Sequence, residues 1–204
     1  MTIHETIIVR TLMRSLALLI FKCAGWKTRG SKPNLTKYVI IAAPHTSNWD
    51  FIYTLCLAFI YRINPVIMMK DAWFRWPLGP VFRWLGARPV DRARANNVVA
   101  QSIEQFHRRG NLVLVVPPSG TRKRVFYWKT GFYHIANGAG VPIVLGFLDY
   151  RRKIGGFGPV VQPTGDIDAD MTAIRGFYRN ISGKYPLQES RQRLAAGVAP
   201  PVAR

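Results

Sequence analysis

Residues 38–50 read YVIIAAPHTSNWD, and this stretch determines the fold class that we expect. Its first part, 38–43, is a short apolar run with β-branched residues, which is typical of a buried strand. Polar residues follow, and the apolar segment 47–61 then predicts a helix. A buried strand that leads directly into a helix is typical of α/β domains.

The same alternation continues along the chain. Further strands are predicted at 66–69, 88–90, 112–116, 142–148 and 160–162, and further helices at 94–109, 129–137 and 169–182. Between the last two strands, 151–159 predicts a glycine-rich turn. We therefore expect one α/β domain with a mostly parallel or mixed sheet flanked by helices. The predicted division is an N-terminal amphipathic helix at 1–30, the α/β domain at 31–187 and a frayed tail at 188–204.

The charge of the chain indicates an anionic partner. Lysine and arginine number 29 against 10 acidic residues, which gives a net charge of +19 in 204 residues. Nucleic acid is disfavoured as that partner, because no helix-turn-helix, zinc or RNA-recognition motif is present and the basic residues are spread through predicted turns. Cys23 and Cys56 form no CxxC pair, which excludes a disulfide scaffold and a zinc finger.

The N-terminal segment predicts an amphipathic helix. Its most apolar run, 15–21, is far shorter than the roughly 18–20 residues that span a bilayer, and Glu5 argues against a signal peptide. Apolar residues recur at helical spacing at Ile7, Ile8, Leu12, Leu16 and Leu19. This stripe either lies in a membrane surface or packs on the protein's own core. The segment 73–85 is rich in tryptophan and arginine, and it either faces a membrane or lines the site of an acyl chain, or packs as a core hairpin of helices.

His45 and Asp50 form the candidate catalytic pair. Ligand sites of α/β sheets commonly lie where a strand ends and a helix begins. If the loop doubles back, the Asp50 carboxylate can accept from one imidazole nitrogen and leave the other free as a base. The alternative is structural, with Ser47 or Asn48 capping the helix and His45 serving as a core histidine.

Four sequence blocks in order then identify a family. His45 and Asp50 form an HxxxxD motif, and the later blocks are GARPVDR at 86–92, PSGTR at 118–122 and VPIV at 141–144. Together they resemble the glycerolipid acyltransferases, which include glycerol-3-phosphate and lysophosphatidic acid acyltransferases. The resemblance covers somewhat over half of the chain.

The resemblance implies a role for each matching residue. His45 would take the proton from an acceptor hydroxyl as it attacks an acyl thioester, and Asp50 would orient His45. Arg92 would engage the acceptor phosphate, which suits the planar fork of arginine. Ser119, Gly120, Thr121 and Arg122 would shape the acceptor site.

The family further implies the substrates and the location. The acyl donor would be acyl-CoA or acyl carrier protein, with no metal and no other cofactor. The acceptor would be a lysophospholipid, most specifically 1-acyl-glycerol-3-phosphate, which would become phosphatidic acid. The protein would be monotopic, on the anionic membrane surface at the cytoplasmic face of the inner membrane.

One departure from the family pattern leaves the acceptor open. Ser119 stands where the third block usually has glutamate, and serine cannot carry that negative charge. A different lyso-lipid acceptor is therefore an alternative. The remaining alternatives are a thioester hydrolase, although no GxSxG elbow is present, and a non-enzymatic protein that binds anionic membranes or nucleic acid.

Overall fold

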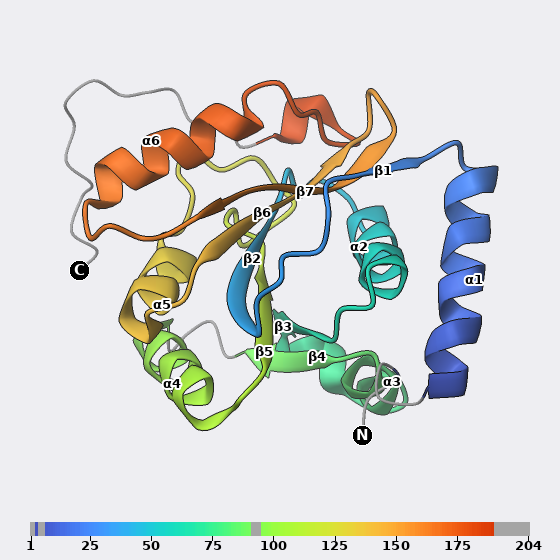
Figure 1. Cartoon of the computed structure of the whole chain (residues 1–204), viewed down its shortest axis with the longest axis horizontal. Coiled ribbons are helices and arrows are strands. Elements are labelled where there is room, and N and C mark those ends of the chain that lie inside the picture. The colour runs from blue at the N-terminus through green and yellow to red at the C-terminus, as the bar shows by residue number, and fades with distance from the viewer. Residues whose placement is uncertain (1–2, 4–6, 91–94, 190–204) are drawn as a thin grey trace.

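The computed structural model describes residue 3 and residues 7–90 and 95–189 of the chain (Figure 1). The strands are β1 (Lys27–Arg29), β2 (Lys37–Ala43), β3 (Pro65–Lys70), β4 (Ala87–Val90), β5 (Leu112–Val116), β6 (Ile143–Asp149) and β7 (Ile154–Val161). The α-helices are α1 (Ile7–Cys23), α2 (Trp49–Ile60), α3 (Leu78–Trp84), α4 (Ala95–Arg108), α5 (Gly131–Ala139) and α6 (Ile167–Tyr178). Two short 3₁₀-helices are η1 (Asp71–Phe74) and η3 (Pro186–Gln188).

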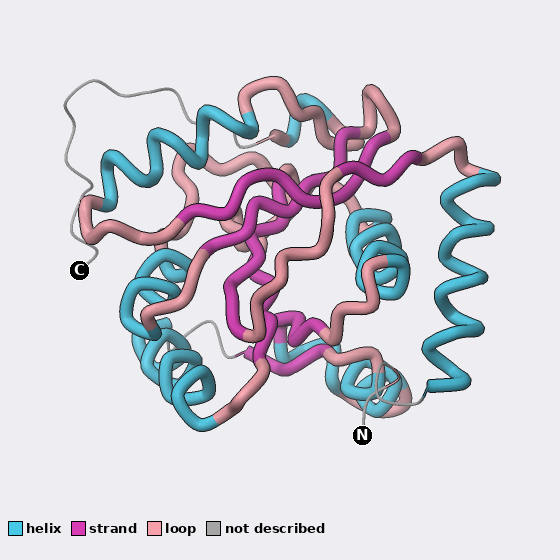
Figure 2. Tube along the Cα trace, viewed as in Figure 1, coloured by secondary structure: helices cyan, strands magenta, loops and turns pink. Residues whose placement is uncertain are grey.

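The strands form one mixed sheet in the order β1-β7-β6-β2-β5-β3-β4. Neighbouring strands run parallel except β6 and β7, which are antiparallel. β2 lies at the centre, between β5 and β6 (Figure 2). Its side chains are almost all buried, as expected for a strand covered on both faces. The predicted α/β class with a mixed sheet and flanking helices is confirmed.

Helices cover both faces of the sheet (Figure 1). On one face α4, α5 and α6 pack through Phe106, Phe132 and Ile174 against Val39 and other strand residues. On the other face lies α2, with α1 outside it. The two helices pack together through a cluster that includes Ala17, Phe21, Leu57 and Phe59.

The glycine-rich stretch at 151–159 is not the turn that we expected. Most of it belongs to β7, and the turn is confined to 150–153, where Lys153 has a φ of 52°. The glycines permit a close approach between strands, because a Cβ at Gly156 would collide with the carbonyl oxygen of Arg29 in β1. The prediction was therefore wrong about the strand, since it took the glycines as turn formers.

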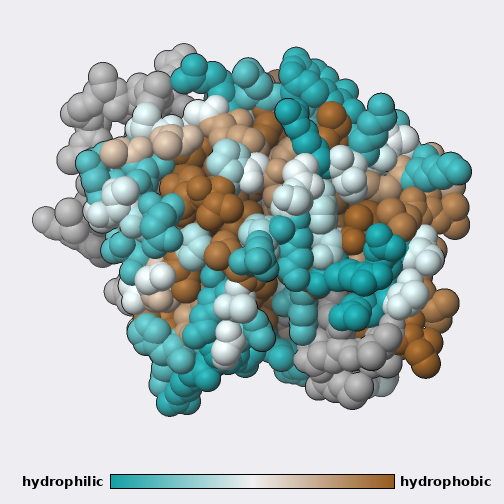
Figure 3. All heavy atoms as spheres, in the orientation of Figure 1, coloured by the Kyte–Doolittle hydropathy of each residue, from teal (hydrophilic) through white to brown (hydrophobic). Residues whose placement is uncertain are grey.

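The structure places the apolar stripe of α1 away from the core. Ile8 is 73% exposed and Leu12 is 65% exposed, and Leu16 and Leu19 are exposed as well. The core contact is made by the opposite side of the helix, with Ala17 and Phe21 fully buried. Core packing and an exposed apolar face therefore coexist in one helix. Figure 3 shows hydrophobic residues gathered at the edge that α1 forms.

The aromatic segment is exposed in the same way. Trp73, Trp76 and Trp84 remain open to solvent, whereas Phe82 packs on Phe51 with ring centroids 6.2 Å apart. This segment adjoins the start of the chain, because the Ile3 amide donates to the Trp84 carbonyl oxygen. In the part of the chain that the structure describes, no helix has both the length and the apolarity to cross a bilayer.

Several predicted features lie partly or wholly outside the described residues, including the first residues of the predicted helices at 1–30 and 94–109. Arg92 in the second block falls in the gap at 91–94. The tail lies outside from 190 onward, whereas Glu189 is buried. The side chain of Ile7 is also outside the described set. The division at residues 30 and 187 stays a prediction.

Candidate active site

His45 lies in the loop that joins the carboxyl end of β2 to α2, and Asp50 lies in the first turn of that helix. Because the loop doubles back, the imidazole Nδ1 comes within 3.1 Å of Asp50 Oδ2. The same oxygen accepts from the backbone amides of Thr46 at 2.8 Å and Ser47 at 2.9 Å. These amides hold the carboxylate in place, and the Nδ1 bond leaves Nε2 of His45 available to a ligand.

Asp50 is an ionised acceptor. Its side chain is 5% exposed, while that of His45 is 25% exposed. Burial raises the pKa of the Asp50 carboxyl, but hydrogen bonds from His45, Tyr150 and Ser47 outweigh burial and hold the pKa below its ordinary value. At neutral pH the carboxylate can therefore only accept hydrogen bonds, so Nδ1 of His45 carries the proton.

Tyr150 is a third member of the cluster that the sequence analysis missed. Its hydroxyl donates to Asp50 Oδ1 at 2.6 Å from a position 100 residues along the chain. Burial, and then the hydrogen bond to Asp50, raise the pKa of Tyr150, so the hydroxyl stays protonated. The one available signal was positional. Tyr150 follows the predicted strand 142–148, and the carboxyl ends of parallel strands meet at one edge of a sheet.

The third block lies beside this pair, in the loop between β5 and α5. Gly120, Thr121 and Arg122 line the same cavity as His45 and Asp50. Ser119 is buried, and its hydroxyl donates to the Thr121 carbonyl oxygen at 2.7 Å. The structure thus brings together every predicted site residue that it describes, with Ser119 occupied in supporting the loop rather than lining the cavity.

Lys129 is a second residue that the sequence analysis did not single out. Its backbone amide donates to the Pro118 carbonyl oxygen at 2.8 Å, and its side chain lies over Gly120. A Cβ at Gly120 would be 3.3 Å from the Lys129 Cδ and 3.7 Å from its Nζ. Gly120 also has a φ of +63°, a conformation that favours glycine. The third block therefore contains one cation, Arg122, and the side chain of a second, Lys129, lies against its glycine.

A cavity of about 520 Å³ extends from the site beneath α2. At one end are His45 and Arg122, at the carboxyl ends of parallel strands. At the other are Ala58, Ile63 and Pro65, near the start of β3. Its walls are predominantly apolar, as in pockets that bind hydrophobic ligands.

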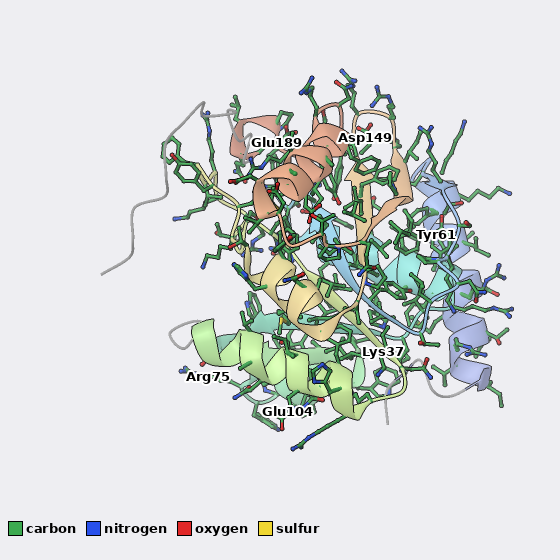
Figure 4. All side chains as sticks on the ribbon, turned by 60° about the vertical axis from the view of Figure 1, so that its left-hand side comes forward. Lys37, Tyr61, Arg75, Glu104, Asp149 and Glu189 are labelled. Atoms are coloured by element: carbon green, nitrogen blue, oxygen red, sulfur yellow. The ribbon has the colours of Figure 1, made fainter. Side chains whose placement is uncertain are left out.

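The segment after α6 packs against the loop that carries His45. The Tyr185 amide donates to Thr46 Oγ1 at 3.2 Å, and a Cβ at Gly183 would be 2.8 Å from the same oxygen. The carboxylate of Glu189 accepts from the Gly183 amide at 2.7 Å. Figure 4 shows Glu189 at the same end of the molecule as Asp149, the last residue of β6, and away from Lys37 at the start of β2.

The residues that the structure describes include no group of three or more histidine, cysteine, aspartate or glutamate side chains placed to hold a metal ion. The side chains gathered at the site are instead a histidine, its carboxylate partner and two cations. The expectation that the reaction uses no metal and no cofactor stays a prediction.

Comparison with known proteins places the chain in a family. No curated protein matches the sequence. A crystal structure of the 1-acyl-sn-glycerophosphate (LPA) acyltransferase PlsC from Thermotoga maritima is similar in fold, with a TM-score of 0.57 and 16% identity, over 86% of this chain and 82% of that one. The family described as Acyltransferase matches residues 27–144, which carry the four sequence blocks, and the chain belongs to this acyltransferase family.

Proposed function

We propose that the protein transfers a fatty acyl group from an acyl thioester to the hydroxyl of a lysophospholipid, with 1-acyl-glycerol-3-phosphate as the acceptor. The observation that carries this proposal is the His45–Asp50 pair, with its 3.1 Å contact, at one end of an apolar cavity. The acceptor is suggested by the fold shared with an LPA acyltransferase. The donor is acyl-CoA or acyl carrier protein.

In the proposed mechanism His45 acts as the general base. Nε2 removes the proton of the acceptor hydroxyl while its oxygen attacks the thioester carbonyl carbon, forming the new C–O bond. The C–S bond then breaks, and the thiolate takes the proton back from the imidazolium. Asp50 stabilises the imidazolium through Nδ1 and fixes the tautomer.

Cations at the third block support a phosphorylated acceptor. Arg122 lines the cavity, and the side chain of Lys129 lies over Gly120. Arginine can grip a phosphate with two parallel hydrogen bonds, and lysine can neutralise a further charge. In this proposal Arg92 contributes the phosphate contact that the family resemblance implies.

The apolar cavity is the proposed site for an acyl chain. It runs beneath α2 between Phe51 and Leu57 on the helix and Ile40 and Val115 on the sheet. Burying methylene groups there stabilises the bound chain by about 0.8 kcal/mol per group. The chain would enter beside His45, so that its carbonyl carbon stays within reach of the acceptor hydroxyl.

The exposed apolar surface of α1 and α3 supports binding to a membrane. Leu12, Leu16 and Leu19 are exposed on α1, and Trp76 and Trp84 are exposed in the neighbouring segment. Aromatic side chains suit the boundary between lipid and water, and the net charge of +19 favours an anionic leaflet. The proposed location is the cytoplasmic face of the inner membrane, where the acyl donors are found.

Membrane binding can be tested on the exposed face without removing α1, whose opposite side belongs to the core. A Leu12→Ser, Leu16→Ser, Leu19→Ser variant should sediment less with anionic liposomes while keeping its circular dichroism spectrum. Thr11→Ser provides a matched control on the same helix. Undiminished sedimentation of the triple variant would contradict this docking face.

A second acceptor class is favoured by one observation. Ser119 replaces the glutamate that is usual in the third block, and its hydroxyl is engaged with the Thr121 carbonyl oxygen. The site therefore has no carboxylate at this position. A lyso-lipid other than 1-acyl-glycerol-3-phosphate is the corresponding alternative.

The experiment that tests the proposal is mass spectrometry of the lipids formed from a labelled acyl-CoA or acyl carrier protein and a panel of lyso-acceptors. Labelled phosphatidic acid should form from 1-acyl-glycerol-3-phosphate, and His45→Ala should lower its rate of formation by about 10²–10⁴-fold. Another labelled phospholipid would select the alternative acceptor. Labelled free fatty acid alone would indicate a hydrolase and contradict the proposal.

A further inference from the structure

We infer that Tyr150 is a positioning residue for the His45–Asp50 pair and sets how strongly Asp50 holds the imidazole. The inference rests on the proposed function, because it assumes that His45 is the base. Neither the sequence blocks nor the family match, which ends at residue 144, includes Tyr150.

The geometry divides the donors around Asp50 between its two oxygens. Oδ2 accepts from His45 Nδ1 and from the amides of Thr46 and Ser47. Oδ1 accepts from the Tyr150 hydroxyl at 2.6 Å, the shortest of these four contacts. With both oxygens held, the carboxylate cannot rotate about its Cβ–Cγ bond and lose its contact with His45.

The Tyr150 ring is itself fixed from two directions. The Trp26 ring meets it edge-on, with centroids 5.0 Å apart and planes at 88°, and Tyr53 contacts it at 6.0 Å and 77°. Trp26 and Tyr53 also pack on each other at 4.4 Å. The Tyr150 backbone amide donates to the Ser182 carbonyl oxygen at 2.8 Å. The hydroxyl is therefore aimed at Asp50 by its packing.

The hydrogen bond from the Tyr150 hydroxyl also stabilises the negative charge of the Asp50 carboxylate. Titratable groups near Tyr150 and Asp50 come from several elements: His45 from the loop before α2, Tyr53 from α2, and Tyr185 from the segment after α6. Because this hydrogen bond lowers the pKa of the Asp50 carboxyl, removing the Tyr150 donor should raise that pKa.

Tyr150→Phe tests the inference on the full-length protein, with a long-chain acyl-CoA and 1-oleoyl-glycerol-3-phosphate as substrates. We expect kcat to fall about tenfold with little change in either KM. We also expect the acid limb of kcat/KM to move to higher pH, because the pKa of Asp50 rises when the Tyr150 donor is lost. A merely structural role would not move this limb.

The matched control is another buried tyrosine–aspartate pair among the described residues. The Tyr133 hydroxyl donates to Asp170 Oδ2 at 2.8 Å, on the other side of the sheet. Tyr133→Phe should lower thermal stability but leave the pH profile unchanged. If Tyr150→Phe shows the same acid limb as the wild type, or loses no more kcat than Tyr133→Phe, the inference is wrong.

A second variant keeps the test decisive if Tyr150→Phe folds poorly. Replacing Tyr150 by 3-fluorotyrosine preserves the ring and makes the hydroxyl a stronger donor, so the acid limb should move to lower pH. An unmoved limb overturns the inference. His45→Ala distinguishes a failure of the proposed function from a failure of the Tyr150 inference. Full activity in His45→Ala contradicts the proposed function. If His45→Ala is inactive while Tyr150→Phe keeps the activity and pH profile of the wild type, only the inference about Tyr150 is contradicted.

Discussion

The two faces of the central sheet differ in how completely they are filled. On the side of α4, α5 and α6, side chains such as Leu145, Ile174 and Phe132 are almost wholly buried in one continuous core. On the side of α2, small residues such as Ala42 and Gly146 line a cavity that ends at His45. One face of the sheet therefore provides stability, whereas the other leaves space for a ligand.

The largest expected effect lies on the cavity side. His45→Ala should lower acyl transfer by about 10²–10⁴-fold, the range for loss of a general base, while the unfolding midpoint stays close to wild type. Initial rates with labelled acyl donor, in a preparation free of host acyltransferase, measure this. Near-normal turnover of His45→Ala would mean that His45, on the cavity side of the sheet, is not the general base.

The converse is expected on the filled side. Ile174→Ala removes a side chain with no exposed surface and should lower the free energy of unfolding by about 2–5 kcal/mol. Turnover per folded molecule should remain close to wild type, because Ile174 lies across the sheet from His45. Denaturant unfolding monitored by circular dichroism gives the stability. A loss of kcat without a loss of stability would break the division between the two faces.

A smaller effect is expected at the rim of the cavity. Arg122→Ala should raise the KM for a phosphorylated acceptor by about 10–150-fold, the cost of a charge-assisted hydrogen bond, with little change in the KM for the donor. Arg122→Lys should recover only part of this, because an ammonium lacks the bidentate fork. Equal effects on phosphorylated and unphosphorylated acceptors would show that Arg122 does not contact the phosphate.

The inner end of the cavity should determine acyl-chain length. Ala58 is buried and lines the cavity on α2. Ala58→Phe would fill space there, so we expect a several-fold preference for shorter acyl donors. Competition between acyl-CoAs of different lengths measures the shift, and Ala139→Ser in α5, across the sheet, is a control. An unchanged preference would place the chain elsewhere.

The filled face was largely predictable from the sequence, and the cavity face much less so. Strands 38–43 and 112–116 are continuous apolar runs, and burial on both faces fixes such runs as strands. β1 was missed because its three residues are all exposed and depend on pairing with β7. Tyr150, the second side-chain partner of Asp50, was missed because it lies 100 residues along the chain and only the order of the strands brings the two residues together.

The smallest expected effect is on the free energy of unfolding at acid pH. It tests whether the hydrogen-bond donors around Asp50 stabilise its carboxylate in the folded state. Burial raises the pKa of this carboxyl, but hydrogen bonds from His45, Tyr150 and Ser47 place it below the ordinary value. The folded state therefore binds this proton more weakly than the unfolded chain. The resulting stabilisation is fully present above the unfolded pKa of about 4 and is lost as pH falls toward the lower folded value.

The measurement is the difference in unfolding free energy between the wild type and Asp50→Asn. This difference should shrink as pH falls from about 6 to about 3, with the wild type losing its advantage at the acid end. Asp71→Asn, at an exposed aspartate in η1, is the matched control and should track the wild type throughout. If the Asp50→Asn difference is constant over this range, the four donors around Asp50 do not hold its carboxylate more tightly in the folded state than water does in the unfolded chain.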